Sequence, residues 1–144
     1  MLGMLKKYTV ELCPEVNGKI SNNGTPIENL LIERSLTYAD EEYLDNCITN
    51  ANGEFSFEAK SIKSRLPGNI LHEPVVRQAI YLDVESNNYL LWYAYQDGIS
   101  TIEAFKPKLN NLIAEITNPE KDYRIETNIE GEKSYKVFSI CNLK

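Results

Sequence analysis

The fold of this chain is decided by the stretch Asn22-Asn23-Gly24-Thr25-Pro26, together with a second one, Asn50-Ala51-Asn52-Gly53-Glu54-Phe55. Asn-Gly is the strongest short-range signal for a β-hairpin, because both residues tolerate the positive φ angles of a type I′ turn. Each stretch stands between runs that alternate like β-strands. The two turns therefore mark the ends of an antiparallel β unit.

Outward from these turns, alternating apolar and polar residues predict strands along most of the chain. Residues 60–74 are the longest irregular segment, and we expect a surface loop with a helical turn there. Many short strands without a long helical period predict a β-sandwich or a barrel. The expected strands cover residues 7–13, 16–21, 27–36, 54–59, 75–84, 89–95, 99–105, 109–117 and 134–141.

Length and charge bound the class of protein. The 144 residues predict one domain, residues 1–144, large enough for a core without disulfides or metals. The net charge of −6 argues against a nucleic-acid binder and against binding to anionic lipid, because both need a surplus of Lys and Arg. An acidic protein can instead attract a basic partner.

The cysteines and the N-terminal residues predict a cytoplasmic protein. Cys13, Cys47 and Cys141 are an odd number at wide spacing, which is typical of reduced thiols rather than of a disulfide framework. The first ten residues lack the order of charge, apolar core and small residues of a signal peptide, and no run is long enough to span a membrane.

Several motifs of the chain match the pattern of a known class of β-domain. They are Gly18-Lys19-Ile20, Gly24, Pro26-Ile27, Ile32, Arg34, Thr49-Asn50, Asn52 to Phe57, His72 to Gln78 and Tyr89 to Trp92. In these motifs the chain resembles the carboxypeptidase-regulatory-like or transthyretin-like β-sandwich modules, and most closely a bacterial family of small uncharacterised proteins built on such a domain. It implies an all-β, single Ig-like antiparallel sandwich of about seven to nine strands and no established activity. Asn29 departs from the small residue, such as Gly, that is usual at its position.

Catalytic and metal-binding patterns are weak. A Ser-His-Asp or Cys-His device would have to use His72, the only histidine, which lies two residues before Pro74. The sequence contains no Gly-x-Ser-x-Gly nucleophile elbow. The three cysteines and His72 lie far apart in sequence, whereas zinc ligands are grouped at short spacing. We therefore expect no catalytic residue, no metal and no cofactor.

The segment between the two turns carries the best candidate for binding a partner. It is the densest acidic cluster of the chain and also contains tyrosines, which are enriched at protein interfaces. The alternative interpretation is a solvated loop or edge strand whose charges prevent aggregation. The candidate residues are Tyr38, Asp40, Glu41, Glu42, Tyr43 and Asp45.

A second candidate surface is the strand of residues 89–95. Tyr89, Leu91, Tyr93 and Tyr95 share one face of it by alternation, while the other face carries Trp92 and is expected to point into the core. The tyrosine face then has three interpretations: an exposed surface that binds a partner, a second inner face of the sandwich, or a dimer contact. Tyr89, Tyr93, Tyr95 and His72 are secondary surface candidates.

These observations favour a non-enzymatic bacterial binding protein that recognises a protein partner through an acidic, tyrosine-containing surface, with an immunity-like or secretion-associated role as its most concrete form. The alternatives are a carbohydrate- or cell-surface-binding module and, third, an enzyme that uses His72 or a carboxylate pair. The sequence does not determine the oligomeric state.

Overall fold

The computed structural model describes residues 6–127 and 133–144. In it, both predicted turns contact the same strand, β2 (Val16–Asn22). Asn23 and Gly24 have φ angles of 51° and 82°, and Asn22 pairs with Thr25, so this turn is the expected type I′ hairpin between β2 and β3 (Thr25–Pro26). In the second turn, Gly53 has a φ of 74° and its carbonyl accepts a hydrogen bond from the Ile20 N–H.

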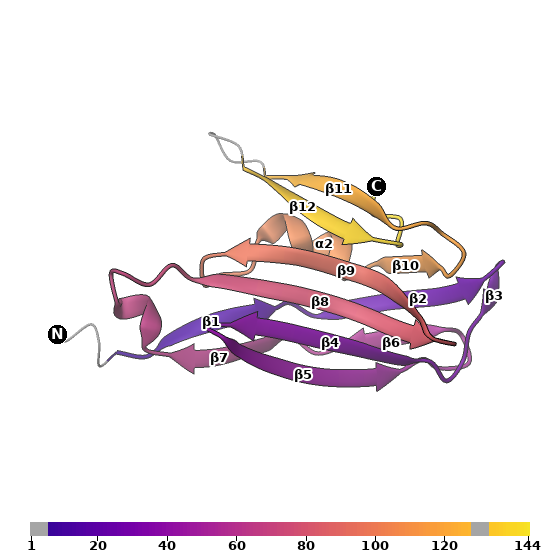
Figure 1. Ribbon diagram of the computed structural model, residues 1–144, viewed down its shortest axis with the longest axis horizontal. Helices are drawn as coiled ribbons and strands as arrows, with labels where there is room; N and C mark the ends of the chain where they lie inside the picture. Colours follow the sequence, from indigo (N-terminus) through magenta and orange to yellow (C-terminus); the bar gives the residue numbers. More distant parts are fainter. Residues whose placement is uncertain (1–5, 128–132) are drawn as a thin grey trace.

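The strands form three sheets (Figure 1). The largest has the order β11 (Lys121–Glu126), β12 (Ser134–Ser139), β9 (Asn87–Asp97), β8 (Val75–Val84), β4 (Leu31–Tyr38), β5 (Glu41–Ile48), and all of its pairs are antiparallel. In the second sheet β2 pairs with β3, with β6 (Glu54–Phe57) and, in parallel, with β10 (Leu112–Glu115). The third pairs β1 (Tyr8–Cys13) with β7 (Lys60–Ser64).

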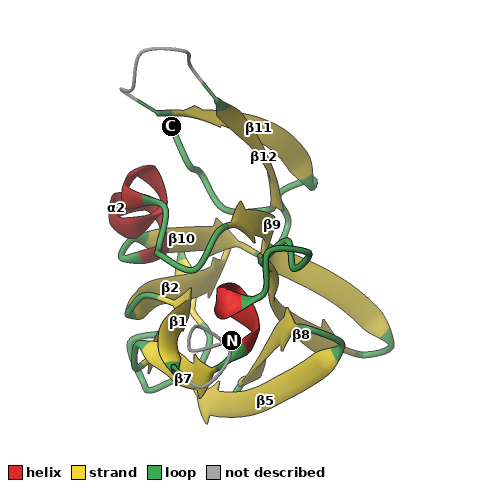
Figure 2. Cartoon of the chain, turned by 90° about the vertical axis from the view of Figure 1, so that its left-hand side faces the viewer, coloured by secondary structure: helices red, strands yellow, loops and turns green. Residues whose placement is uncertain are grey.

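The six-stranded sheet packs against the two smaller sheets, so the fold is an all-β, sandwich-like arrangement (Figure 2). Apolar side chains at alternate positions fill the space between the layers, as the sequence pattern predicts. In β8, Val76, Ile80 and Leu82 are buried, and in β1 the same holds for Val10 and Leu12.

The structure corrects several expected elements. It has twelve strands in the described residues, more than the seven to nine expected. The segment expected to be a loop, residues 60–74, begins with strand β7, whereas its remaining residues form the expected loop with a helical turn, η1 (Leu66–Gly68). Neither β5 nor β11 is among the strands expected from the sequence. The strand expected at residues 99–105 is instead a loop followed by the helical turns η2 (Glu103–Phe105) and α2 (Lys106–Leu109). No helix in the described parts of the chain is long and apolar enough to cross a membrane.

A β-bulge in β9 changes which side chains face the core. Ile80 of β8 pairs with Trp92, but the next residue, Tyr81, pairs with Leu90, so Leu91 is the extra residue. Leu91 and Trp92 are therefore both buried, whereas strict alternation predicts that Leu91 shares the tyrosine face. The expectation that Trp92 points into the core is confirmed.

Candidate functional site

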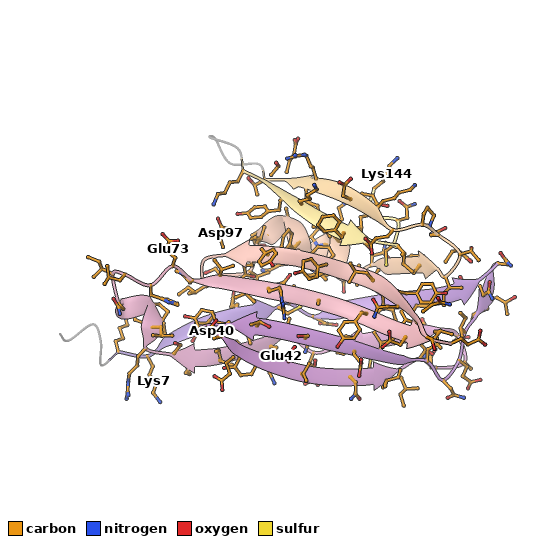
Figure 3. All side chains as sticks on the ribbon, in the orientation of Figure 1. Lys7, Asp40, Glu42, Glu73, Asp97 and Lys144 are labelled. Carbon is orange, nitrogen blue, oxygen red and sulfur yellow. The ribbon has the colours of Figure 1, made fainter. Side chains whose placement is uncertain are left out.

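Several of the candidate residues meet at one end of the six-stranded sheet, although they lie far apart in sequence. Asp40 comes from the β4–β5 turn, His72 and Glu73 from the loop before β8, Arg77 from β8, and Tyr95 from β9; together they line a pocket of about 350 Å³. Figure 3 shows Asp40 and Glu73 at the same end of the molecule. This pocket joins the two regions that the sequence singled out separately.

Tyr38 lies beneath this pocket and not on the surface. Its side chain is only 2% exposed, and its hydroxyl forms a 2.8 Å hydrogen bond with Nε2 of His72, whose ring stands edge-on to the tyrosine ring. A partner could not reach a side chain that is buried in this way. The contact instead fixes the loop that carries His72 to the end of β4.

Among the residues that the structure describes, the most exposed large apolar side chains belong to this same loop. Ile70 and Leu71, which we call the apolar loop tip, are 94% and 88% exposed. The loop is held by backbone hydrogen bonds from Asn69 N to Leu66 O and from His72 N to Asn69 O, and Asn69 Oδ1 accepts from Leu71 N. An ordered loop therefore presents two adjacent large aliphatic side chains to solvent, and contiguous apolar surface with a polar rim is typical of interaction sites.

Beside the loop tip, the β4–β5 turn carries the acidic hairpin, defined as Asp40, Glu41 and Glu42. All three side chains are exposed, and none forms an ion pair with a described Lys or Arg. Glu41 accepts a hydrogen bond from the hydroxyl of half-buried Tyr43, and Glu42 accepts one from Ser35. β5 is an edge strand, so both the binding interpretation and the solvated-edge interpretation remain compatible with its position.

Asp45 has a structural partner, which separates it from the other carboxylates. Arg34, 1% exposed, donates from Nε and Nη2 to the two Asp45 oxygens at 2.9 and 2.5 Å, and from Nη1 to Glu58 O. Burial alone would lower the pKa of Arg34, but the hydrogen bonds to Asp45, together with the neighbouring Cys13 and the charge of Asp45, outweigh burial and raise that pKa. The Arg34 guanidinium also lies over the Phe57 ring. Asp45 therefore compensates a buried charge.

The tyrosines of β9 are divided between two environments. Tyr95 is 51% exposed, and its hydroxyl lies 3.1 Å from that of Tyr93, ring edge to ring face. Tyr89 is half-buried against the core. Arg77, next to Tyr95, donates to the Thr37 hydroxyl at 3.0 Å, while its Nε is buried without a hydrogen-bond partner. Tyr93 and Tyr95 thus form an open face beside the pocket.

The three cysteines are free thiols, and the described residues contain no group of three or more His, Cys, Asp or Glu that could hold a metal ion. Burial raises the pKa of Cys13 to about 11 and that of Cys141 to about 12. These thiols stay protonated in the folded protein under conditions in which an unfolded chain ionises them.

The buried thiols predict how stability depends on alkaline pH. Because the folded-state pKa values are raised, the native state holds more protons than the unfolded state above pH 9, so the free energy of unfolding falls as pH rises. We expect a loss of about 2–3 kcal/mol per pH unit once both thiols ionise in the unfolded chain. Urea unfolding between neutral and alkaline pH measures this slope. A Cys13→Ala/Cys141→Ala variant with the same slope as wild type would contradict it.

Fold and surface together define an all-β, sandwich-like protein with a pocket, an apolar loop tip and an acidic hairpin at one end of its main sheet. The chain belongs to the family described as "Domain of unknown function (DUF6795)", which matches residues 16–119. No curated protein and no solved structure matches the chain. The resemblance to carboxypeptidase-regulatory-like modules therefore stays a prediction.

Proposed function

We propose that this protein is a non-enzymatic binding protein that recognises a protein partner at the end of the sheet where the apolar loop tip and the acidic hairpin meet. The observation that carries the proposal is the exposure of Ile70 and Leu71, 94% and 88%, on a loop that is already ordered by its own hydrogen bonds. Ordering before binding lowers the entropy cost of association, so such a loop favours recognition.

The charges next to the loop tip favour a partner with a basic surface. Asp40, Glu41, Glu42 and Glu73 are exposed and form no ion pair among the described residues. Unpaired carboxylates around an apolar centre resemble the polar rim and apolar core of a protein interface. They would speed the approach of a basic partner and orient it, while Ile70 and Leu71 would supply the buried contact.

The same charges disfavour the other surface that exposed aliphatic side chains could enter, an anionic membrane. Phosphate headgroups would repel Asp40, Glu41, Glu42 and Glu73 as the loop tip approached. The neighbouring β1–β7 side carries three lysines, Lys6, Lys7 and Lys63, which could attract anionic lipid. The test therefore has to distinguish membrane binding from partner binding.

A photo-crosslinking residue in place of Leu71 identifies the partner in cells. The affinity is then measured with the purified wild-type protein and the purified partner. The change to test is Ile70→Ser/Leu71→Ser. We expect at least a tenfold loss of affinity, since truncating an interface hot spot costs about 2 kcal/mol or more, with little change in melting temperature because both side chains are exposed. Ile113→Ser, an exposed residue of β10, is the matched control and should bind like wild type.

Three results would count against the proposal. The double variant could bind the partner as tightly as wild type. The Ile113→Ser control could lose as much affinity as the double variant. Wild type could bind phosphatidylcholine–phosphatidylglycerol vesicles through Ile70 and Leu71, which would assign the loop tip to a membrane. In the binding assay with the purified partner, Asp40→Asn/Glu41→Gln/Glu42→Gln should slow association and weaken the salt dependence of the association rate.

A further inference from the structure

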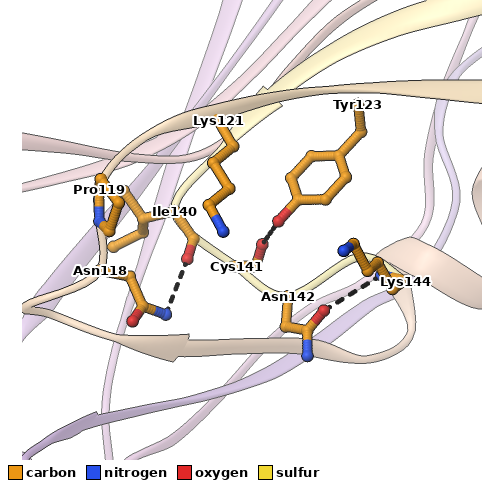
Figure 4. A pocket seen from close by; sticks show the side chains of 8 residues that line it. All are labelled: Asn118, Pro119, Lys121, Tyr123, Ile140, Cys141, Asn142 and Lys144. Carbon is orange, nitrogen blue, oxygen red and sulfur yellow. Dashed lines mark hydrogen bonds between the residues drawn. The ribbon is translucent and has the colours of Figure 1, made fainter.

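A second pocket lies at the other end of the molecule, between β11 and the C-terminal segment 140–144. Its volume is about 300 Å³, and its walls include Lys121 and Tyr123 of β11 and Lys144 (Figure 4). Lys144 is far from Asp40 and Glu73 in Figure 3, so this pocket is separate from the proposed partner site.

The pocket is cationic in an acidic protein. Two of its lining residues are lysines and none is an Asp or Glu, although the chain has 21 acidic and 15 basic residues. Other lysines, such as Lys106 and Lys136, form ion pairs with carboxylates, whereas Lys121 and Lys144 form none within the described part of the chain. Two like charges that face one hollow repel each other unless an anion lies between them.

The backbone acceptors in the pocket wall are already occupied. The Tyr123 hydroxyl donates to Cys141 O at 2.9 Å, and Asn118 Nδ2 donates to Ile140 O at 3.2 Å, as Figure 4 shows. Asn142 N donates to Ile113 O at 3.1 Å, which ties the C-terminal segment to β10. The wall is therefore fixed, and these bonds leave the two ammonium groups free to bind a ligand from solvent.

The acidic neighbours of Lys121 in the sequence lie outside this pocket. Asp122 is the next residue of β11, so its side chain points to the opposite face of the strand, where it pairs with Lys136 at 3.5 Å. Glu120, the residue before, lines a neighbouring hollow together with Lys121, Asp122 and Phe138, but it does not line this pocket. Lys121 therefore borders both hollows, and no described Asp or Glu side chain lines the one that it shares with Lys144.

We propose that this pocket binds a small molecule that carries a phosphate group, held between the ammonium groups of Lys121 and Lys144. A phosphate near neutral pH carries close to two negative charges and matches two lysines, which bind it as point charges. The volume exceeds that of a bare phosphate ion, so the pocket has room for a short organic part against Pro119 and Tyr123. Only binding is proposed, and the thiol of Cys141 in the pocket wall is buried.

The test is titration of the ¹⁵N-labelled protein with inorganic phosphate and with glycerol 3-phosphate, with glycerol as the uncharged control. We expect both phosphates to shift the amide signals of residues 118–123 and 140–144, with glycerol 3-phosphate binding more tightly. Lys121→Gln/Lys144→Gln should weaken both at least tenfold. Lys7→Gln/Lys19→Gln removes the same charge from two exposed lysines elsewhere and should bind like wild type.

Each other result would overturn the proposal. If phosphate shifts no signal of the pocket, the site does not bind it. If the control variant loses as much affinity as Lys121→Gln/Lys144→Gln, the effect is one of net charge alone. If glycerol binds as well as glycerol 3-phosphate, the pocket does not select an anion. None of these outcomes depends on the protein partner at the loop tip.

Discussion

Asp45→Ala is expected to lower the free energy of unfolding by about 2–4 kcal/mol, although aspartate is a surface residue type and lies on an edge strand. The reason is Arg34, which is 1% exposed and directs two nitrogens at the Asp45 carboxylate. Removing the carboxylate leaves a buried cation without its counter-charge. A fully buried pair would lose about 3–5 kcal/mol, but the Asp45 side chain is 38% exposed, so water compensates in part. Urea unfolding at neutral pH gives the value.

Two further variants show whether the cost comes from the buried charge. Glu41→Ala removes an exposed carboxylate of the same strand that is not ion-paired, and should change the free energy of unfolding by less than about 0.5 kcal/mol. Arg34→Met/Asp45→Leu removes both charges and should recover most of the lost stability, because a buried pair replaced by apolar residues costs little. Equal losses for Asp45→Ala and Glu41→Ala would show that Arg34 does not depend on Asp45.

This pair also shows how the candidate site differs from its sequence prediction. Tyr38 to Asp45 reads as one acidic and aromatic segment, and the sequence gives no reason to divide it. The antiparallel pairing of β4 with β5 turns Asp45 toward Arg34 and leaves Glu42 on the outer face, while Tyr38 is buried under His72. Which members of a cluster are free to bind depends on register and on partners distant in sequence.

The fold followed from local chemistry where that chemistry was strong. Asn23-Gly24 formed the expected type I′ hairpin, and the alternating pattern of residues 75–84 gave strand β8 with its predicted core face. β7, Lys60–Ser64, has one apolar residue, Ile62, and is a strand because β1 pairs with it. A polar strand held by its neighbour carries no periodic signal of its own.

The apolar loop tip was missed for a related reason. Ile70 and Leu71 are a short apolar pair in an irregular segment, and such a pair in a sequence is as compatible with the core as with the surface. The signal that could have indicated exposure is the flanking Pro67-Gly68, Asn69 and Pro74, which predict a turn that projects from the sheets. Sequence alone cannot distinguish a turn that folds back over the core from one that extends into solvent.

Gly53→Ala is expected to lower the free energy of unfolding by about 4 kcal/mol or more, a loss that single substitutions rarely cause. Gly53 has a φ of 74°, and a Cβ on it would lie 2.3 Å from the carbonyl oxygen of Ile20 and 3.2 Å from the Ile27 nitrogen. Both are backbone atoms, and the Ile20 carbonyl accepts a hydrogen bond from Ile27 N. The added methyl group would therefore push β2 away from the turn before β6. Urea unfolding, or the yield of folded protein by circular dichroism, measures the effect.

Gly24 separates the two possible causes of that loss. Its φ of 82° is close to that of Gly53, but a Cβ there would meet nothing within 4 Å. Gly24→Ala thus carries only the backbone strain, about 1–2 kcal/mol, and the excess cost of Gly53→Ala measures the collision with Ile20. Asn adopts positive φ readily, so Gly24→Asn should be close to wild type, whereas Gly53→Asn still carries the Cβ and should remain as damaging as alanine. A stable Gly53→Asn variant would contradict this expectation. It would mean that the positive φ, and not the space for a Cβ, restricts the residue at this turn, and that β2 can move to accommodate a side chain.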